Sequence, residues 1–199
     1  GKNGSVAGSI GTSTTNSLTF KTGTTERMRI DSSGKVGIGT TSAETALHVT
    51  RENGSPQLTL ERTGSATGKY SLAAVSNEFR LTDEAQSAER LRIDSSGRLL
   101  VGTSSSTVIN GDAYKAQIVA SDASAGLGIT RTSNNNASPY LSLVKSRSGG
   151  IVSDGDTLGL FQFIGHDGTD FNTCSAAISA YVDGTPGAND MPGRLSFST

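Results

Sequence analysis

The sequence predicts an all-β fold: an elongated, repeat-containing fibre of short strands and hairpins that assembles as an intertwined homotrimer. Residues 26–42 recur as residues 89–105, at an offset of 63, and 11 of the 17 aligned residues are identical. Only 33% of the chain is hydrophobic and 5% is aromatic, with no Trp, which is low for a single compact core. The 25 glycines and the abundant Ser and Thr favour turns and short strands over long helices. Such a chain is expected to complete its core with copies of itself.

The duplicated segment sets the expected domain organisation, because repetition at a fixed offset is typical of units that stack along a chain. We expect a first unit over residues 1–63 with a hairpin at 26–42. A second unit covers 64–105 with a hairpin at 89–105, and a β-rich insert module covers 106–199. Residues 195–199 resemble 18–22, so the insert is expected to lead into a truncated third repeat.

The first strand and the first hairpin follow from alternation. Residues 17–22 alternate apolar and polar, as a half-buried strand does. Met28 and Ile30 are then expected on one face of a strand and Arg27 and Arg29 on the other. Val36 and Ile38 resume the apolar face after a turn, which predicts a β-hairpin.

The residues of the turn explain why it recurs. Asp31 and Asp94 can accept hydrogen bonds from the backbone two residues on, and Gly34 and Gly97 can adopt the positive φ that closes a short loop. Gly37 and Gly39 alternate with apolar residues, which suggests close approach of another backbone, as near the axis of a multi-chain fibre. Leu100 replaces Gly37 in the second copy, so close approach is not obligatory at that position.

The remaining strands are short apolar runs bounded by Gly, Asn, Ser or Pro, with a turn at Asn53–Pro56. The expected runs are 46–49, 57–61, 70–72, 78–82, 116–119, 126–130, 139–144, 156–165, 176–182 and 193–199.

Charge and composition argue against several classes of protein. The 17 basic and 18 acidic residues give a net charge of −1, without the basic footprint of a nucleic-acid binder. The balanced charge and the alternating patterns also argue against disorder. No apolar run is long enough for membrane insertion, and no signal peptide is visible. The chain begins with Gly1, so we expect an internal stretch of a longer protein. Cys174 is alone and predicts neither a disulfide nor a cysteine-rich zinc site.

Candidate chemical groups are sparse. His48 and His166 are far apart in sequence, so a paired metal or catalytic role is not favoured over packing or surface roles. Residues 154–156 and 166–170 cluster oxygen ligands, but neither follows the calcium-binding loop, and Asp-Gly is foremost turn chemistry. There is no phosphate-binding loop and no nucleophile elbow. We therefore expect no catalytic residue, no metal and no cofactor.

The repeated arginines have two interpretations. They could form a basic stripe that attracts anionic surface glycans, or they could pair with Glu26 and Glu89 in ladders between neighbouring strands or chains. The second interpretation is favoured because each arginine pair recurs beside its glutamate. The predicted structural repeat site consists of Arg27, Arg29, Ile30, Asp31, Gly34, Gly39, Arg90, Arg92, Ile93, Asp94, Gly97 and Gly102.

Residues 26–41 resemble the shaft repeats of tail fibre and appendage proteins of tailed bacteriophages, especially those of aquatic bacteria. Residues 183–199 resemble the stretch that commonly precedes this repeat in such proteins. The resemblance implies a trimeric, β-rich shaft in the virion, outside the cell. It also implies other virion tail proteins and a host cell-surface receptor, such as a glycan, as partners. No receptor-binding tip and no self-cleaving chaperone domain are recognisable in the sequence.

The function expected from these observations is structural and not enzymatic. The chain is expected to be a segment of a phage tail fibre that positions receptor-recognition elements for adsorption, with three aligned copies multiplying weak contacts. One alternative is a tailspike-like glycan depolymerase with a site between chains, because paired carboxylates could come from different copies. Another is a bacterial surface adhesin or filament subunit built of similar repeats.

Overall fold

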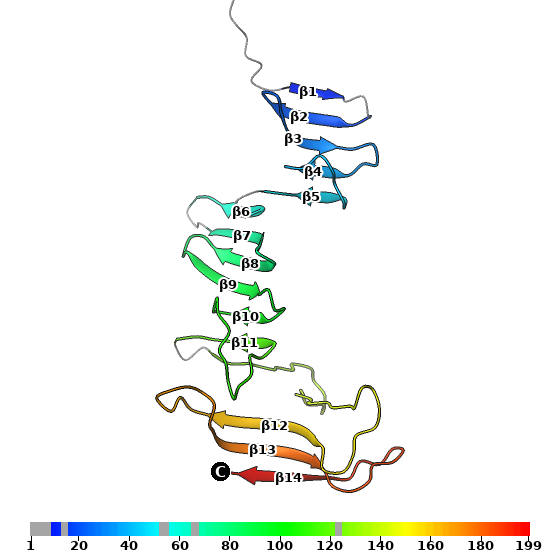
Figure 1. The fold of residues 1–199 in the computed structure, drawn as a ribbon, viewed down its shortest axis with the longest axis vertical. Helices are drawn as coiled ribbons and strands as arrows, with labels where there is room; N and C mark the ends of the chain where they lie inside the picture. The colour runs from blue at the N-terminus through cyan, green and yellow to red at the C-terminus, as the bar shows by residue number, and fades with distance from the viewer. Residues whose placement is uncertain (1–8, 13–15, 52–55, 65–67, 122–124) are drawn as a thin grey trace, which may run out of the picture. The chain divides into compact units, whose positions relative to one another are not determined.

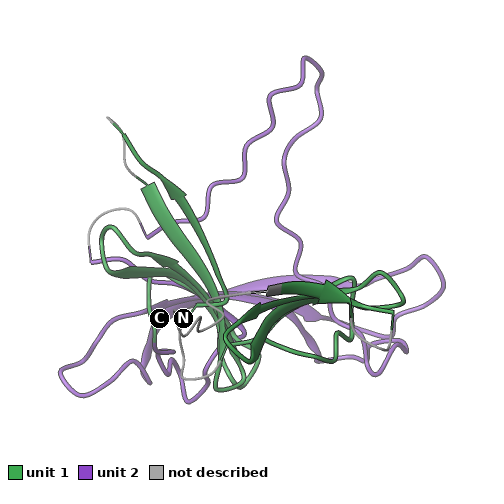
Figure 2. Cartoon of the chain, turned by 90° about the horizontal axis from the view of Figure 1, so that it is seen from above, with its two compact units in different colours: residues 1–104 green, residues 105–199 purple. Residues whose placement is uncertain are grey.

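The computed structural model describes residues 9–12, 16–51, 56–64, 68–121 and 125–199 (Figure 1). These residues form three sheets of short strands, none closed into a barrel, and contain no helix. The prediction of an all-β chain is therefore confirmed. Within these ranges there is accordingly no helix of the length and apolarity needed to cross a membrane. Two compact units, Gly1–Ser104 and Ser105–Thr199, are distinguished by colour in Figure 2. Of the turn predicted at Asn53–Pro56, residues 53–55 lie outside the described residues.

The first sheet of unit 1 follows the chain strand by strand. The first four strands pair in antiparallel fashion, and the fifth pairs in parallel with the fourth. The parallel pair is unusual because the loop between its strands is only eight residues long, from 39 to 46. The strands are β1 (Ser9–Thr12), β2 (Leu18–Thr22), β3 (Thr25–Ile30), β4 (Val36–Ile38) and β5 (Leu47–Val49).

The second sheet of unit 1 is an antiparallel meander in the order β10-β9-β8-β7-β6. Ser76 and Asn77 both have positive φ, 52° and 64°, and close the tight turn between its second and third strands in chain order. Such primed turns match the twist of the strands that they join. The strands are β6 (Leu58–Arg62), β7 (Gly68–Val75), β8 (Glu78–Asp83), β9 (Ala88–Ile93) and β10 (Leu99–Val101).

Unit 2 contains the short strand β11 (Ala116–Ile118) and an antiparallel sheet of β12 (Thr157–Ile164), β13 (Cys174–Val182) and β14 (Gly193–Ser198). The register aligns Phe161, Ile178 and Phe197 in one row across the three strands. Gly159, Ala180 and Leu195 form the next row on the same face. Because side chains alternate along a strand, this face is almost wholly apolar.

Two of the predicted strands are wrong. Residues 126–130 and 139–144 have alternating apolar side chains, yet both are irregular chain. A strand needs a partner backbone as well as a suitable pattern. No backbone hydrogen bond joins either run to another described segment. Unit 2, purple in Figure 2, accordingly carries long stretches of chain without strand arrows.

The chain buries little apolar surface by itself. The buried apolar side chains of the described residues are Ala43, Leu100, Val152, Val182 and Pro186. Phe197 remains 74% exposed, Phe163 57% and Leu195 67%.

Candidate functional site

The two copies of the duplicated segment fold into the same hairpin. In the first, β3 pairs with β4 so that Met28 is opposite Ile38 and Ile30 is opposite Val36. In the second, β9 pairs with β10 in the same register, with Leu91 opposite Val101. Each copy therefore forms the hairpin that its sequence predicts, with the apolar residues of both strands on one face.

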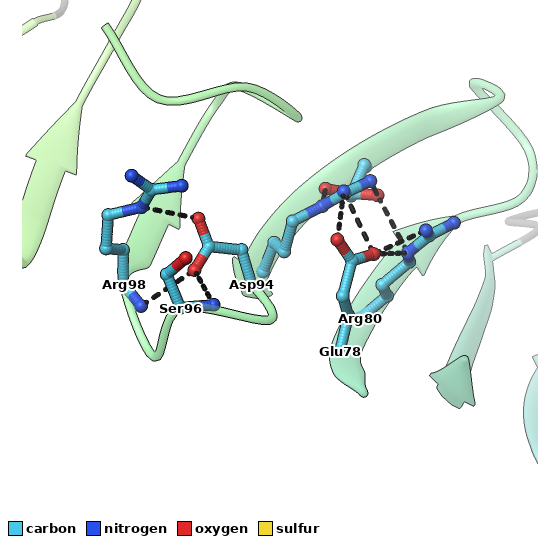
Figure 3. Close-up of polar contacts among 7 residues, drawn as sticks. Glu78, Arg80, Asp94, Ser96 and Arg98 are labelled. Carbon is cyan, nitrogen blue, oxygen red and sulfur yellow. Dashed lines mark hydrogen bonds and ion pairs between the residues drawn. The ribbon is translucent and has the colours of Figure 1, made fainter. Parts of the chain in front are cut away.

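An aspartate organises the turn of each hairpin. Asp31 Oδ1 accepts hydrogen bonds from the backbone N–H groups of Ser33 at 2.8 Å and Lys35 at 2.9 Å. Asp94 repeats both contacts with Ser96 and Arg98, at 2.9 and 3.0 Å (Figure 3). The Arg98 side chain adds an ion pair, with Nε 2.6 Å from Asp94 Oδ2. Gly34 and Gly97, with φ of 80° and 70°, close the two turns.

A β-bulge in each copy brings the glutamate to the side of the arginine. Arg27 is the extra residue where Phe20 pairs with Met28 and Lys21 pairs with Glu26. The bulge reverses the alternation, so Glu26 shares a face with Arg29 although they are three residues apart. Arg29 donates to Glu26 from Nε at 2.7 Å and from Nη2 at 3.0 Å. The corresponding bulge at Arg90 follows the same pairing pattern on β8.

The second copy repeats this two-bond ion pair between an arginine and a glutamate, and extends it to a glutamate on the neighbouring strand. Arg92 donates to Glu89 at 2.6 and 2.8 Å and to both oxygens of Glu78 on β8 at 3.0 Å. Arg80 Nε donates to Glu78 at 3.0 Å (Figure 3). The Arg92 side chain is only 12% exposed. Hydrogen bonding to Glu89 raises the pKa of Arg92, and hydrogen bonding from Arg80 lowers the pKa of Glu78. Both shifts favour the charged forms of the pair.

The strand before each hairpin is also equivalent, which the sequence comparison missed. Arg27 Nε donates to Thr22 Oγ1 at 2.7 Å, and Arg90 Nη2 donates to Asp83 Oδ2 at 2.6 Å. Thr22 and Asp83 hold the same register position relative to their hairpins. The turn after β8 is two residues longer than the turn after β2, so this strand falls out of the 63-residue offset. The alternation of Phe79 and Leu81, which matches that of Leu18 and Phe20 at an offset of 61, is the sequence signal that could have revealed it.

The covered face of the first hairpin is the polar one. Thr19 is opposite Arg29 on β2 and is 4% exposed, and Gly37 is opposite Arg29 on β4 and is buried. Residues 40–43 fold back over this side, where the Thr41 carbonyl accepts from Arg29 Nη1 at 3.2 Å. In the second copy Leu100 replaces Gly37 and is fully buried beside Arg92.

The apolar face of both hairpins is only partly covered. Ile38 is 40% exposed, Ile93 is 44% exposed and Leu99 is 39% exposed. Each hairpin therefore largely covers Arg29 or Arg92 and leaves part of its apolar side to water. This distribution is the reverse of a monomeric two-layer fold, where the apolar face is covered.

The close approach expected at Gly37 and Gly39 is made by the chain itself. A Cβ on Gly39 would lie 2.3 Å from the Thr50 carbonyl oxygen, and one on Gly37 would lie 2.7 Å from the Thr40 carbonyl oxygen. The Gly39 and Gly102 amides donate to the Arg27 and Arg90 carbonyls at 2.9 and 3.3 Å. These glycines thus let the chain after β4 turn sharply, which does not require a second chain.

The other candidate groups serve local structure. His48 Nδ1 accepts from the Glu44 amide at 3.4 Å, and His166 packs edge-on against Phe171 at 4.9 Å between ring centroids. Asp154 accepts from the Gly184 amide, and Asp167 accepts from the amides of Thr169 and Asp170. Over the part of the chain that the structure describes, no three His, Cys, Asp or Glu side chains gather as metal ligands.

Comparison with protein-family models gives no match, and a search of curated proteins finds no relative either. The chemistry of the two hairpins must therefore be read from their own geometry. Their polar groups are paired internally, so this site fixes structure and presents an apolar face outward.

We expect the aspartates of the two turns to make the stability of the protein depend on pH in the acid range. Backbone N–H groups, first those of Lys35 and Arg98, lower the pKa values of Asp31 and Asp94. A carboxyl group with a lowered pKa contributes its full stabilisation above its unfolded pKa of about 4 and loses it as the pH falls toward the folded value. The melting temperature should therefore hold from neutral pH to about pH 5 and fall below about pH 4. Asp31→Asn with Asp94→Asn should shrink that fall, and an unchanged pH profile would contradict the assignment.

We expect the ion pairs of Arg92 and Arg29 to contribute different amounts to the free energy of unfolding. Arg92→Ala removes the guanidinium that Glu89 and Glu78 share, leaving Arg80 as the remaining cation near both, and should lower the free energy of unfolding by about 2 kcal/mol. Arg29→Ala affects one carboxylate, that of Glu26, and the Arg29 side chain is more exposed than that of Arg92. This substitution should therefore lower the free energy of unfolding by about 1 kcal/mol. Urea unfolding of the two variants tests the order. Equal losses would show that the Glu78 contact contributes nothing.

Proposed function

We infer that this chain is a structural segment of a bacteriophage tail fibre that assembles as a homotrimer through the apolar faces of its hairpins and sheets. One observation carries the proposal: each duplicated hairpin keeps Arg29 or Arg92 largely covered and leaves Ile38 or Ile93 exposed. A face of this kind needs an apolar partner, and a second copy offers the same face. The resemblance of residues 26–41 and 183–199 to phage shaft segments supports the same assignment.

Assembly of three chains agrees with the recurrence of exposed apolar side chains along the sequence. Exposed apolar side chains occur on the first hairpin, on the second hairpin and on the β12-β13-β14 sheet. Copies aligned in parallel would bring these side chains to their equivalents in the other chains, so every level of the shaft would be closed in the same way. Such a shaft resists shear and holds receptor-recognition elements away from the virion.

In this role the partners are other virion tail proteins and a host cell-surface receptor, for which surface glycans are the candidate chemistry. Three copies on one shaft align weak receptor contacts and raise the effective concentration of each. The location is the virion, outside the cell. The chain itself contributes spacing and alignment, and it performs no reaction.

The location is tested by immunogold electron microscopy with an antibody raised against the purified 199-residue segment. We expect labels along the tail fibres of virions from the phage whose genome encodes the chain. Labels on host cells free of virions would replace the proposal with a surface adhesin. New reducing ends after incubation with host polysaccharide would replace it with a glycan depolymerase.

A further inference from the structure

Residues 125–146 form an arm within unit 2 that has two extended flanks and a polar turn at 134–136. Asn135 holds the turn, because its Oδ1 accepts from the Ala137 amide and from Arg131 Nη2, both at 3.1 Å. Across the described residues of the two flanks, 125–133 and 137–146, no backbone hydrogen bond joins one flank to the other. Both flanks therefore have β-patterned sequence, and among the described residues neither is part of a backbone ladder.

The returning flank is fixed to its own sheet. A Cβ on Gly159 would lie 2.9 Å from Leu143 Cδ1, so this leucine lies directly on β12. Arg147, just beyond the arm, makes a forked ion pair with Asp156 at 2.8 Å, and Lys145 Nζ lies 3.3 Å from the same carboxylate. These contacts hold the end of the flank against the start of β12.

An apolar groove runs between the returning flank and the sheet. Its volume is about 220 Å³. The groove opens onto the same face as Phe197, which is 74% exposed. Its apolar lining is Leu141, Leu143, Leu158, Phe161, Ile178 and Leu195.

The outgoing flank, residues 125–133, has a form complementary to this groove. Leu127 and Ile129 alternate with Gly126 and Gly128, so over residues 126–129 one side of the flank is apolar and the other carries no side chain. Leu127 is 70% exposed and Ile129 is 45% exposed, and no atom lies within 4 Å of a Cβ built on either glycine. A flank of this form can enter a narrow groove while its backbone pairs with a neighbouring strand.

We propose that the outgoing flank of one copy lies in the groove of the next copy and pairs with its returning flank, so that the arms are exchanged around the oligomer. This inference rests on the proposed homotrimer. The outgoing flank of nine residues spans roughly 30 Å when extended, whereas packed sheets are about 10 Å apart, so it can reach a neighbour. Donor and acceptor are different segments, and such a head-to-tail contact forms a ring when the rotation between copies closes, as it does in a trimer.

Single-cysteine chains test the exchange. In a Cys174→Ser background, one chain carries Leu127→Cys and a second carries Leu141→Cys, and the two are co-expressed and oxidised. We expect a disulfide-linked heterodimer on denaturing gels, formed far more than with a matched pair of Leu127→Cys and Ser198→Cys chains. Ser198 lies on the opposite face of β14 from Phe197, so its thiol should not meet the flank.

The outcomes separate this inference from the proposed function. An oligomer by light scattering that gives no 127–141 link overturns the exchange and leaves the trimer standing. A folded monomer overturns both. Hydrogen exchange on the unmodified protein gives a second test, because amides of residues 126–130 and 139–144 should be protected in the oligomer. Fast exchange at both flanks would overturn the proposal.

Discussion

Phe197→Asp is expected to dissociate the assembly into single chains. Phe197 lies in one row with Phe161 and Ile178 on the apolar face of the β12-β13-β14 sheet, and 74% of it is exposed in the isolated chain. In a trimer this side chain would be buried against other copies, so its replacement loses about 2 kcal/mol of apolar burial per chain. Burying the introduced carboxylate adds several kcal/mol more for each of three chains. The trimer should then be absent at micromolar concentration.

Ser198→Asp is the matched control for this substitution. It introduces the same charge one residue along β14, on the opposite face of the sheet. Light scattering should give the trimer mass for Ser198→Asp and the single-chain mass for Phe197→Asp. Retention of the trimer by Phe197→Asp would show that this face lies outside the interface.

Gly39→Ala is expected to cause the largest loss of stability among single methyl additions. Gly39 has φ of 74°, and a Cβ there would lie 2.3 Å from the Thr50 carbonyl oxygen. Thr50 is fixed, because its amide donates to the Ile38 carbonyl at 2.9 Å and its hydroxyl donates to the Gly39 carbonyl at 2.8 Å. Strain from the left-handed backbone and displacement of Thr50 should together cost roughly 3 kcal/mol or more.

Gly34→Ala separates the clash from the backbone conformation. Gly34 has nearly the same φ, 80°, but no atom lies within 4 Å of a Cβ at that position. Its substitution should cost about 1 kcal/mol, the price of the left-handed conformation alone. Urea unfolding of the two variants measures the difference. Equal losses of unfolding free energy would mean that the chain after β4 moves aside at little cost.

The hairpins and most strands could be predicted because their determinants are local. Asp31 and Gly34 define a turn by their own chemistry, and the alternation of Met28 and Ile30 defines the apolar face. The strands at 126–130 and 139–144 could not be judged in this way. Their pattern is as regular as that of β2, but a ladder depends on a partner backbone that sequence does not locate.

The ion pairs show a second limit of prediction from the sequence. The sequence predicts that the arginines pair with neighbouring glutamates, yet Arg29 and Glu26 would face opposite ways on a regular strand. Only the bulge at Arg27 brings them together, and a bulge has no clear sequence signal here. The partner role of Glu78 is equally hidden, because it comes from a strand outside the duplicated segment.

The mass of the purified 199-residue segment in solution tests the central claim most directly. Light scattering across a range of concentrations, with circular dichroism on the same samples, measures assembly and β-structure together. We predict a β-rich particle of three times the 20.4 kDa chain mass. A well-folded monomer that keeps its β-structure at every concentration would contradict the account, because its exposed apolar faces would then have no partner.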